Sequence, residues 1–506
     1  MNKSNVDRIL LDLKVLRQRL SFPNIEANIF LKPTKPTREM LAKYEISAGK
    51  FPLLNFSRSI FYSLPRMFMH TVKYFLRHWK FKKEFEDWKQ RELQHPSVVF
   101  LSHFFGTEVD SSNDNFFGKI PRLVSNLGQD CIILFINHSN ASKIPNNSKL
   151  EGLNCILLPR TRSFRSTFLI FIAQLKLSLM MMKCLFARDG LSVNQKQLFF
   201  ELAVYQTHPN TLLNIILWQN LRDVLNLGKI NSLFITLEGH AYEDLVCKNA
   251  ELEFKSLGIY AYQHAPIVMN QFGLDIFLNS SIRNVTILTS GLVTKERFLT
   301  DRLVLENSIF SIGSSKAVKR QYLSKDHDLM LTQKRLSKCI LFAPEGVLES
   351  TLTIMRIALD CAYEFPNFNF VVRVHPHLST KKIKAMVEKR SAVPRNFLVS
   401  SNSLSHDLES AICCVYRSSA VAIEGLSFGV QPFFLSEGLG DYLDPIDSKS
   451  VPHVAFRDQT DLKLALLELE TSWETDFRKN ITSWIHFQRQ YFGEIDLMLL
   501  SKLFPN

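Results

Sequence analysis

The stretch SLFITLEGHAYEDL, residues 232–245, joins a short apolar run to the start of a helix. A run this apolar is typical of a parallel strand that is buried on both faces of a sheet. A helical segment, Ala241–Ser256, follows it, and a second apolar run, GIYAYQHAP, occupies residues 258–266. Strand, helix and strand in this order indicate a βαβ unit and therefore a parallel sheet.

Apolar runs of the same kind recur on both sides of this unit. In the first half of the chain they occupy residues 97–104, 131–139, 154–160 and 285–291. After residues 308–315 and a polar connector, 316–338, a second series occupies 339–346, 369–376, 397–403, 413–420 and 431–438. A chain of 506 residues is also too long for one ordinary domain. The predicted fold class is α/β, with two tandem Rossmann-like domains (93–305 and 306–458), an N-terminal helical extension (1–92) and C-terminal helices (459–506).

The composition limits the class of partner. A net charge of +13 favours an anionic one, which includes nucleic acid, a phosphorylated small molecule or an acidic lipid surface. No Walker A motif and no GxGxxG after a strand is present, which argues against NTPases and dinucleotide enzymes. No nucleic-acid-binding signature occurs either, so nucleic acid is not expected as a partner. The eight scattered cysteines form no metal or disulfide pattern and suit a reducing cytoplasm.

Two segments raise the question of a membrane. Residues 58–91 mix aromatic side chains with lysine and arginine, which suits either a helix at a lipid headgroup surface or a helix packed on the protein with a solvated basic side. The apolar stretch 165–188 is interrupted by Lys176 and Lys183, so we expect no transmembrane span. That stretch is expected to be a core or crossover helix, with a membrane helix as the alternative.

Polar side chains collect where the strands of the second domain end. Ligands of open α/β sheets bind beyond the carboxyl ends of the strands, so this polarity predicts a pocket for a phosphorylated ligand. We expect Ser418 to cap the following helix, whose free N–H groups would bind a phosphate, although a simple cap is the alternative. Glu424, further along that helix, would reach a ribose hydroxyl or form a structural ion pair. The predicted ligand-binding residues are Glu345, Gly346, Arg373, His375, Pro376, Arg417, Ser418, Ser419 and Glu424.

One His-Pro pair has a distinctive position. His375-Pro376 follows a long apolar strand, and the proline restricts the backbone so that the imidazole points out of the sheet. An imidazole there would donate to a phosphate oxygen and supply positive charge or a proton to a leaving group. A structural capping histidine is the alternative.

The first domain supplies the residue types needed to deprotonate an alcohol. Glu238 ends its strand, Gly239 permits a tight turn, and His240 precedes the next helix. A carboxylate and an imidazole at a strand end suit general base catalysis, unless Glu238 only caps that helix. Gln263, His264 and His103, which lie at or near the ends of other strands, are candidates for binding an acceptor.

The motifs EGHAYE, YAYQHAP, VRVHPH and RSSAVAIEGLSFGVQP, in this order, resemble GT-B glycosyltransferases of bacterial capsule and lipopolysaccharide synthesis. The resemblance covers about residues 97–447 and includes the sialyl-, polysialyl- and Kdo-transferases. It implies that Glu238 is the general base, while His375, Ser418 and Ser419 hold the nucleotide's phosphate. Sialyltransferases of this type carry two adjacent acids before the glycine, whereas the first position here is Leu237. This departure weakens the base assignment and the case for CMP-sialic acid, so a CMP-linked donor is one option among several.

Together these features predict a metal-independent, inverting glycosyltransferase. Its donor would be a nucleotide sugar and its acceptor a surface glycan or a lipid-linked glycan. The enzyme would need no cofactor, since the nucleotide sugar is a substrate, and it would work in the cytoplasm, peripherally on the inner face of the membrane. Glu238, His240 and His375 are the candidate catalytic residues. The alternatives are a CDP-alcohol transferase, a sugar-nucleotide epimerase or a non-catalytic assembly protein on the same fold.

Overall fold

The computed structural model describes most of residues 97–504, together with residues 25–28, 65, 68, 69, 72 and 85. Within 97–504 the gaps are 107–112, 140–151, 161, 188–190, 228–229, 269–270, 279–283, 302–307, 318–326, 377, 389–392, 437–442 and 447–449. The predicted helical extension, 1–92, and its basic aromatic segment, 58–91, lie almost wholly outside the described residues.

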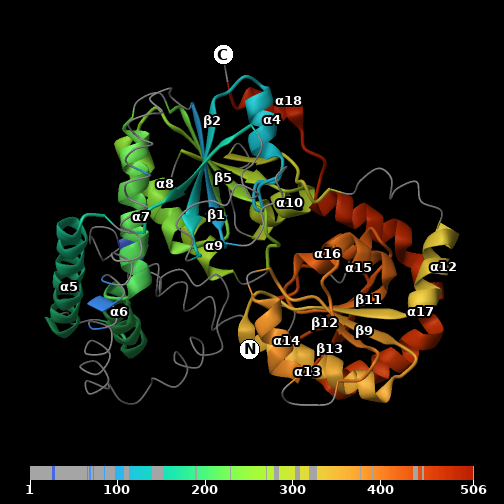
Figure 1. Ribbon diagram of the computed structural model, residues 1–506. Coiled ribbons are helices and arrows are strands. Elements are labelled where there is room, and N and C mark those ends of the chain that lie inside the picture. The colour runs from blue at the N-terminus through green and yellow to red at the C-terminus, as the bar shows by residue number, and fades with distance from the viewer. Residues whose placement is uncertain are drawn as a thin grey trace.

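The described chain forms two lobes, each built on its own parallel sheet (Figure 1). The first sheet has seven strands in the order β3-β2-β1-β4-β5-β6-β7, and the second has six in the order β10-β9-β8-β11-β12-β13. All the strand pairs within these two sheets are parallel. The predicted fold class of two tandem Rossmann-like domains, the GT-B architecture, is confirmed.

The first sheet has helices on both of its faces. Val99 and Leu101 of β1 belong to a core shared with the helices α7 and α8, whereas Val98 and Phe100 belong to a core shared with α4 and α18. Every residue of β1 is buried, as expected for a strand covered on both sides. The strands are β1 (Val98–Phe104), β2 (Cys131–Asn137), β3 (Asn154–Leu158), β4 (Ser232–Thr236), β5 (Gly258–Gln263), β6 (Val285–Thr289) and β7 (Ile309–Ser311). The helices are η1 (Ile25–Ala27), α4 (Ile120–Asn126), α5 (Phe164–Ala187), α6 (Val193–Gln206), α7 (Pro209–Leu225), α8 (Ala241–Glu253), α9 (Phe272–Leu278) and α10 (Leu292–Asp301).

The second sheet is covered in the same way. Ile340 and Phe342 of β8 pack with α13 and α17, and Cys339 and Leu341 pack with α16 on the other face. The strands are β8 (Cys339–Ala343), β9 (Asn369–Val372), β10 (Phe397–Val399), β11 (Ala411–Tyr416), β12 (Gln431–Leu435) and β13 (Val454–Phe456). The helices are α12 (His327–Ser337), α13 (Leu348–Glu364), α14 (Thr380–Glu388), α15 (Leu404–Ser410) and α16 (Ala420–Leu426).

The C-terminal helices connect the two lobes. The long helix α17 (Gln459–Tyr491) runs along the second domain and returns to the first, where α18 (Leu497–Lys502) packs beside α4 (Figure 1). The approach is close: a Cβ atom at Gly313 would lie 2.2 Å from the carbonyl oxygen of Glu494. The tail therefore holds the two domains against each other.

Three expectations need correction. The first sheet extends beyond residue 305, because β7 (Ile309–Ser311) pairs with β6, so the predicted domain boundary is too early. The polar connector 316–338 contains the helix α12, whose Met330 and Leu331 are buried against the second domain. The last strand of the second sheet, β13, was not predicted, because it has only three residues and one of them is exposed.

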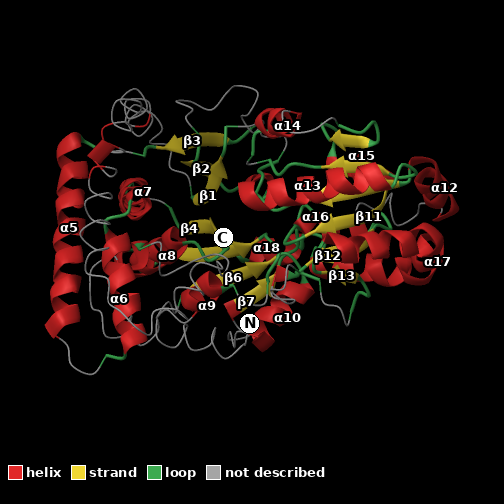
Figure 2. Ribbon diagram, turned by 90° about the horizontal axis from the view of Figure 1, so that it is seen from below, coloured by secondary structure: helices red, strands yellow, loops and turns green. Residues whose placement is uncertain are grey.

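The apolar stretch 165–188 forms α5, as predicted, but not as a core helix. It stands at the outer edge of the first domain, beside α6, in both views (Figures 1 and 2). By length and composition its segment Phe164–Leu185 could cross a membrane, and only 39% of its most apolar window is buried.

Candidate active site

The turn between β4 and α8 is closed by Glu243. Its fully buried carboxylate accepts hydrogen bonds from the backbone N–H groups of Glu238 (3.0 Å), Gly239 (2.7 Å) and His240 (2.8 Å). Gly239 has φ +86°, and a Cβ there would lie 2.5 Å from backbone atoms of Gly273 and Leu274 in α9. Since Glu243 satisfies the start of the helix, Glu238 does not act as its cap, and the Glu238 carboxylate remains available for chemistry.

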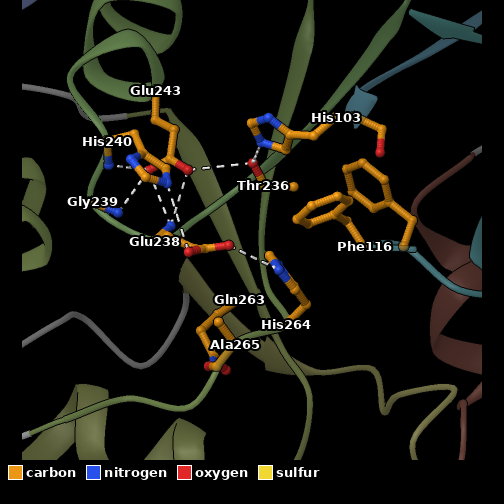
Figure 3. Close-up of polar contacts among 12 residues, drawn as sticks. His103, Phe116, Thr236, Glu238, Gly239, His240, Glu243, Gln263, His264 and Ala265 are labelled. Atoms are coloured by element: carbon orange, nitrogen blue, oxygen red, sulfur yellow. Dashed lines mark hydrogen bonds and ion pairs between the residues drawn. The ribbon is translucent and has the colours of Figure 1, made fainter. Parts of the chain in front are cut away.

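Two imidazoles hold the Glu238 carboxylate. His264, after β5, places Nε2 2.9 Å from Oε1, and His240 places Nε2 3.6 Å from Oε2 (Figure 3). Desolvation raises the pKa of Glu238, but the hydrogen bonds and charges of His240 and His264 outweigh it and hold the pKa well below the ordinary range. Glu238 is therefore ionised at neutral pH, and its side chain is 25% exposed.

His240 is shifted in the opposite direction. Desolvation lowers its pKa, but the hydrogen bond with Glu238 and the charge of Glu243 outweigh that effect and raise the pKa to about 9. Its side chain remains 39% exposed, so the two carboxylates rather than burial determine the result. At neutral pH the site contains a carboxylate beside an imidazolium.

These groups line a cavity of about 730 Å³. The cavity lies at the carboxyl ends of β1, β2, β3 and β4, which is the usual ligand position in open α/β sheets. The second domain contributes Gly346, from the loop after β8. The lining residues are His103, Phe105, Phe116, Ile136, Asn137, His138, Leu158, Pro159, Arg160, Asn210, Leu213, Asn214, Leu217, Glu238, His240, Ala241, Tyr242 and Gly346.

His103 lines the cavity but is 4% exposed and engaged on both ring nitrogens. Nδ1 lies 2.7 Å from Nε2 of His138, and Nε2 lies 2.8 Å from the hydroxyl of Tyr242. Burial lowers the pKa of His103, and the neighbouring imidazoles His138 and His240 lower it further. A neutral His103 thus orients other groups rather than presenting a free nitrogen to an acceptor.

The two other residues predicted to bind an acceptor lie behind the cavity wall. Gln263 is 1% exposed, donates to the carbonyl of Ala265 and accepts from Ser290 at 3.4 Å. His264 pairs with Glu238, and its ring lies edge-on to Phe116 with centroids 5.0 Å apart. His264 therefore acts on the carboxylate, and Gln263 stabilises the turn after β5.

In the second domain, the His375 ring lies directly against Gly346. A Cβ atom at position 346 would come within 3.0 Å of His375 Nδ1, so the imidazole and the cavity-lining loop are in contact. Pro376 follows at the exposed surface. This contact brings the predicted donor-side histidine next to the cavity that contains Glu238.

Arg373 has a different position from the one expected. The strand β9 ends at Val372, and the guanidinium bonds to the buried carboxylate of Asp407 at 2.7 Å and to the carbonyl of Asn402 at 2.9 Å. It is not among the residues that line the cavity. The arginine in this apolar run is explained by an internal ion pair with Asp407, and its predicted contact with the ligand stays a prediction.

The turn after β11 also differs in detail. Ser419, not Ser418, is the N-cap of α16, and it accepts from the N–H of Val421 at 3.4 Å. Glu424 pairs with Lys316 at 3.4 Å, which is the structural ion pair that was its alternative. Since α16 has only seven residues, a helix-terminus phosphate site there has little support, and phosphate binding by Ser418 stays a prediction.

Arg417 and Glu345 lie together near this turn. The guanidinium donates to Ser350 Oγ at 3.0 Å, and its Nε lies 3.7 Å from Glu345 Oε1. The second carboxylate oxygen of Glu345 is buried without a hydrogen-bond partner in the described part of the chain. This pair of a half-buried guanidinium and a buried carboxylate adjoins Gly346 and supports the loop that reaches the cavity.

Sequence reasoning missed several polar groups of the cavity, among them His138, Arg160 and Asn210. The signal was present for two of them, because His138 directly follows the apolar run of β2 and Arg160 follows that of β3. The same rule that selected Glu238 would have selected both. Among the described residues, no group of three or more His, Cys, Asp or Glu side chains could hold a metal ion.

No protein-family model matches this sequence, and no curated protein matches it significantly. The solved structures that are similar to this chain share little sequence identity with it, as three of them illustrate. A protein assigned as a UDP-N-acetylglucosamine 2-epimerase from Listeria monocytogenes has a TM-score of 0.45 at 9% identity, over 81% of this chain and 94% of that one. The UDP-GlcNAc 2-epimerase from Neisseria meningitidis, bound to UDP-GlcNAc, has a TM-score of 0.42 at 10% identity, over 80% and 98%. A variant of the wall teichoic acid polymerase TagF has a TM-score of 0.41 at 11% identity, over 90% and 97%. Values this low support no inference about this chain.

Proposed function

We propose that this protein is a metal-independent, inverting glycosyltransferase that moves a sugar from a nucleotide-sugar donor to a hydroxyl of a surface glycan or lipid-linked acceptor. The observation that carries the proposal is the ionised Glu238 carboxylate, held between two imidazoles in a cavity that also contains the backbone of Gly346 from the other domain. A base contributed by one domain and a loop contributed by the other suit a reaction between two substrates.

In the proposed reaction, Glu238 accepts the proton of the acceptor hydroxyl while the acceptor oxygen attacks the anomeric carbon. The bond between that carbon and the phosphate oxygen breaks, and the nucleotide leaves with the electron pair. Because the pKa of Glu238 is low, the carboxylate is a weak base, so the proton would move late, once bond formation has made the hydroxyl acidic. His375, beside Gly346, would donate to the departing phosphate.

A peripheral site on the inner face of the cytoplasmic membrane belongs to the same proposal. Helix α5 exposes Phe164, Phe168, Leu169, Leu179 and Met180. It contains no acidic residue, and its cations Arg165, Lys176 and Lys183 are also exposed. Apolar side chains among cations suit a helix resting on anionic headgroups. The loop that begins α5 contains Arg160, which lines the cavity, so such contact would bring a lipid-linked acceptor near the site.

An epimerase is the second candidate function. Glu238 and His240 together form an acid–base pair, with a carboxylate and an imidazolium in one cavity, and such a pair could also move protons on a sugar nucleotide without any acceptor. Product analysis separates the two functions, because only a transferase needs an acceptor. A product formed from the nucleotide sugar alone would favour the epimerase.

The experiment begins with thermal-shift screening against CMP, CDP, UDP and GDP, since a ligand that binds the native fold raises its apparent stability. Nucleotide release from the matching sugar donors is then measured with membrane or glycan acceptors. Glu238→Gln should lower kcat by about 10²–10⁴-fold while donor affinity is retained. Glu424→Gln is the matched control, because Glu424 pairs with Lys316 outside the cavity. Unchanged turnover in Glu238→Gln would refute the assignment of the base.

A further inference from the structure

The cavity continues well beyond Glu238. The strand order is β3-β2-β1-β4, with Arg160 after β3, His138 after β2 and Glu238 after β4. Neighbouring strands are about 4.8 Å apart, so the strand before Arg160 lies about 14 Å from the strand before Glu238. The cavity therefore offers a second position, away from the reacting hydroxyl, at which a bound acceptor can be recognised.

Local structure fixes the two residues at this second position. After β2, Asn137 Oδ1 accepts from the N–H of Ser139 at 2.9 Å, and the His138 N–H donates to the carbonyl of Phe104 at 2.7 Å. The His138 ring is stacked on Phe105, with centroids 4.5 Å apart and an interplanar angle of 9°. The turn and the stacked ring hold the imidazole against the cavity wall.

The loop of Arg160 is anchored on both sides. The carbonyl of Pro159 accepts from Asn220 Nδ2 at 2.8 Å, and Arg162 pairs with Asp223 at 2.9 Å. Both partners belong to α7, so the loop is fastened to a helix that also lines the cavity. Arg160, between these two anchors, contributes a permanent positive charge to the cavity wall.

A buried hydrogen-bonded chain orients His138. Its Nε2 lies 2.7 Å from His103 Nδ1, His103 Nε2 lies 2.8 Å from the Tyr242 hydroxyl, and that hydroxyl donates to Glu243 at 3.3 Å. The chain ends at a buried carboxylate. A chain that ends in negative charge favours a donor or a positive charge at its exposed end, which is His138.

The charges along the wall are unequal. Among the described residues that line the cavity, Glu238 is the one acidic residue, and it lies at the β4 end, where two imidazoles contact its carboxylate. Arg160 and His138 lie at the other end, with the carboxamide of Asn210 from α7 also in the lining. An anionic group would be repelled near Glu238 and attracted at the far end.

We propose that Arg160 and His138 form a subsite for an anionic oxygen group of the acceptor, either a phosphate or a carboxylate. The assignment of the anionic group to the acceptor rests on the proposed function. The binding of an anion at Arg160 and His138 does not. His138 touches the ligand, whereas His103 and Tyr242 are positioning residues that act through it. The acceptor class is thereby narrowed to phosphorylated or acidic glycans and lipid phosphates.

The test follows His138 by NMR in protein labelled with [13Cε1]-histidine, with its signal assigned by its loss in His138→Gln. Inorganic phosphate and acetate are titrated separately, each against chloride at equal ionic strength. A saturable shift of the His138 signal is expected. Arg160→Gln should weaken binding on the order of tenfold, as loss of a charge-assisted contact predicts. Arg356→Gln removes the same charge from the exposed side of α13, outside the cavity, and should change nothing.

Phosphate binding without acetate binding identifies a phosphate source, and the reverse identifies a carboxylate. No saturable shift, or equal weakening in Arg160→Gln and Arg356→Gln, would overturn the subsite. Displacement of the bound anion by CMP, CDP, UDP or GDP would assign it to the donor and overturn the acceptor assignment. Tyr242→Phe should change the tautomer-sensitive shifts of His138, and their constancy would exclude the positioning role. Loss of transfer in Glu238→Gln is measured separately, so either proposal can fail alone.

Discussion

The ion pair between Glu238 and His240 can be tested without knowing any substrate. The pKa of His240 is raised to about 9, and its Nε2 lies 3.6 Å from Glu238 Oε2. Replacing Glu238 by Gln removes one of two nearby negative charges and keeps the shape of the side chain. An opposite charge at this distance shifts a pKa by about 1–3. Because the His240 ring is 39% exposed and Glu243 remains, we expect its pKa to fall by about 1, the lower end of that range.

The assay is a pH titration of the His240 signal in [13Cε1]-histidine-labelled protein, assigned by its loss in His240→Gln. A midpoint near the ordinary value of about 6.5 in the unsubstituted protein, or an identical midpoint in Glu238→Gln, would refute the electrostatic account of the site. The same shift has a consequence for stability. Since the folded pKa lies above the unfolded one, the contribution of His240 is complete below pH about 6.5 and is lost as the pH rises through 9.

Three further outcomes are expected. Gly313→Ala should lower the free energy of unfolding in urea more than Gly128→Ala, because both glycines have positive φ but only the Cβ at position 313 would clash with backbone atoms. Gly128→Ala should lower it by about 1–2 kcal/mol. Equal losses in the two variants would contradict the packing at Gly313. Arg373→Gln should lower the stability of the second domain by about 3 kcal/mol in urea unfolding, because it leaves the buried Asp407 carboxylate without its cation. Reduced donor affinity at unchanged stability would instead indicate that Arg373 binds the donor phosphate. Phe168→Asp on α5 should reduce sedimentation with anionic vesicles several-fold, because it removes apolar contact area and adds a negative charge. Equal binding of the two proteins to anionic vesicles would exclude this face.

The fold could be predicted because the buried strands have recognisably apolar sequences. Strands β1 and β4 are buried at every residue, so their sequences are mostly apolar, and the polar residues at and beyond their carboxyl ends mark the ligand edge. This rule placed Glu238 at the cavity. It could equally have placed His138 and Arg160, which follow β2 and β3.

Partners between distant elements were not accessible from the sequence. Nothing near Arg373 indicates that its carboxylate partner is Asp407, because α15 is brought beside the end of β9 only by the folded sheet. The pairing of Glu238 with His264 likewise depends on the direction of two side chains at neighbouring strand ends. Glu243 lies in the first turn of the predicted helix, but the sequence does not show that its carboxylate accepts the N–H groups at the helix start. These hydrogen bonds, which leave Glu238 out of the capping, depend on the folded structure.

The position of Gly346 shows how the two domains would share one reaction. Its backbone lines the cavity that contains Glu238, and the His375 ring is already packed against it, so no side chain fits at position 346 without moving the imidazole. In the proposed reaction, only the backbone of Gly346, with no side chain, would lie between a donor bound by the second domain and the cavity of the first domain. The tail supports this arrangement, because Gly313 of the first domain packs closely against Glu494, in the segment that follows α17, and this segment cannot withdraw from the first domain without losing the contact. A contact far from the chemistry would thus influence how near the donor-side loop lies to Glu238, and we expect a substitution at Gly313 to reduce transfer although this residue lies outside the cavity.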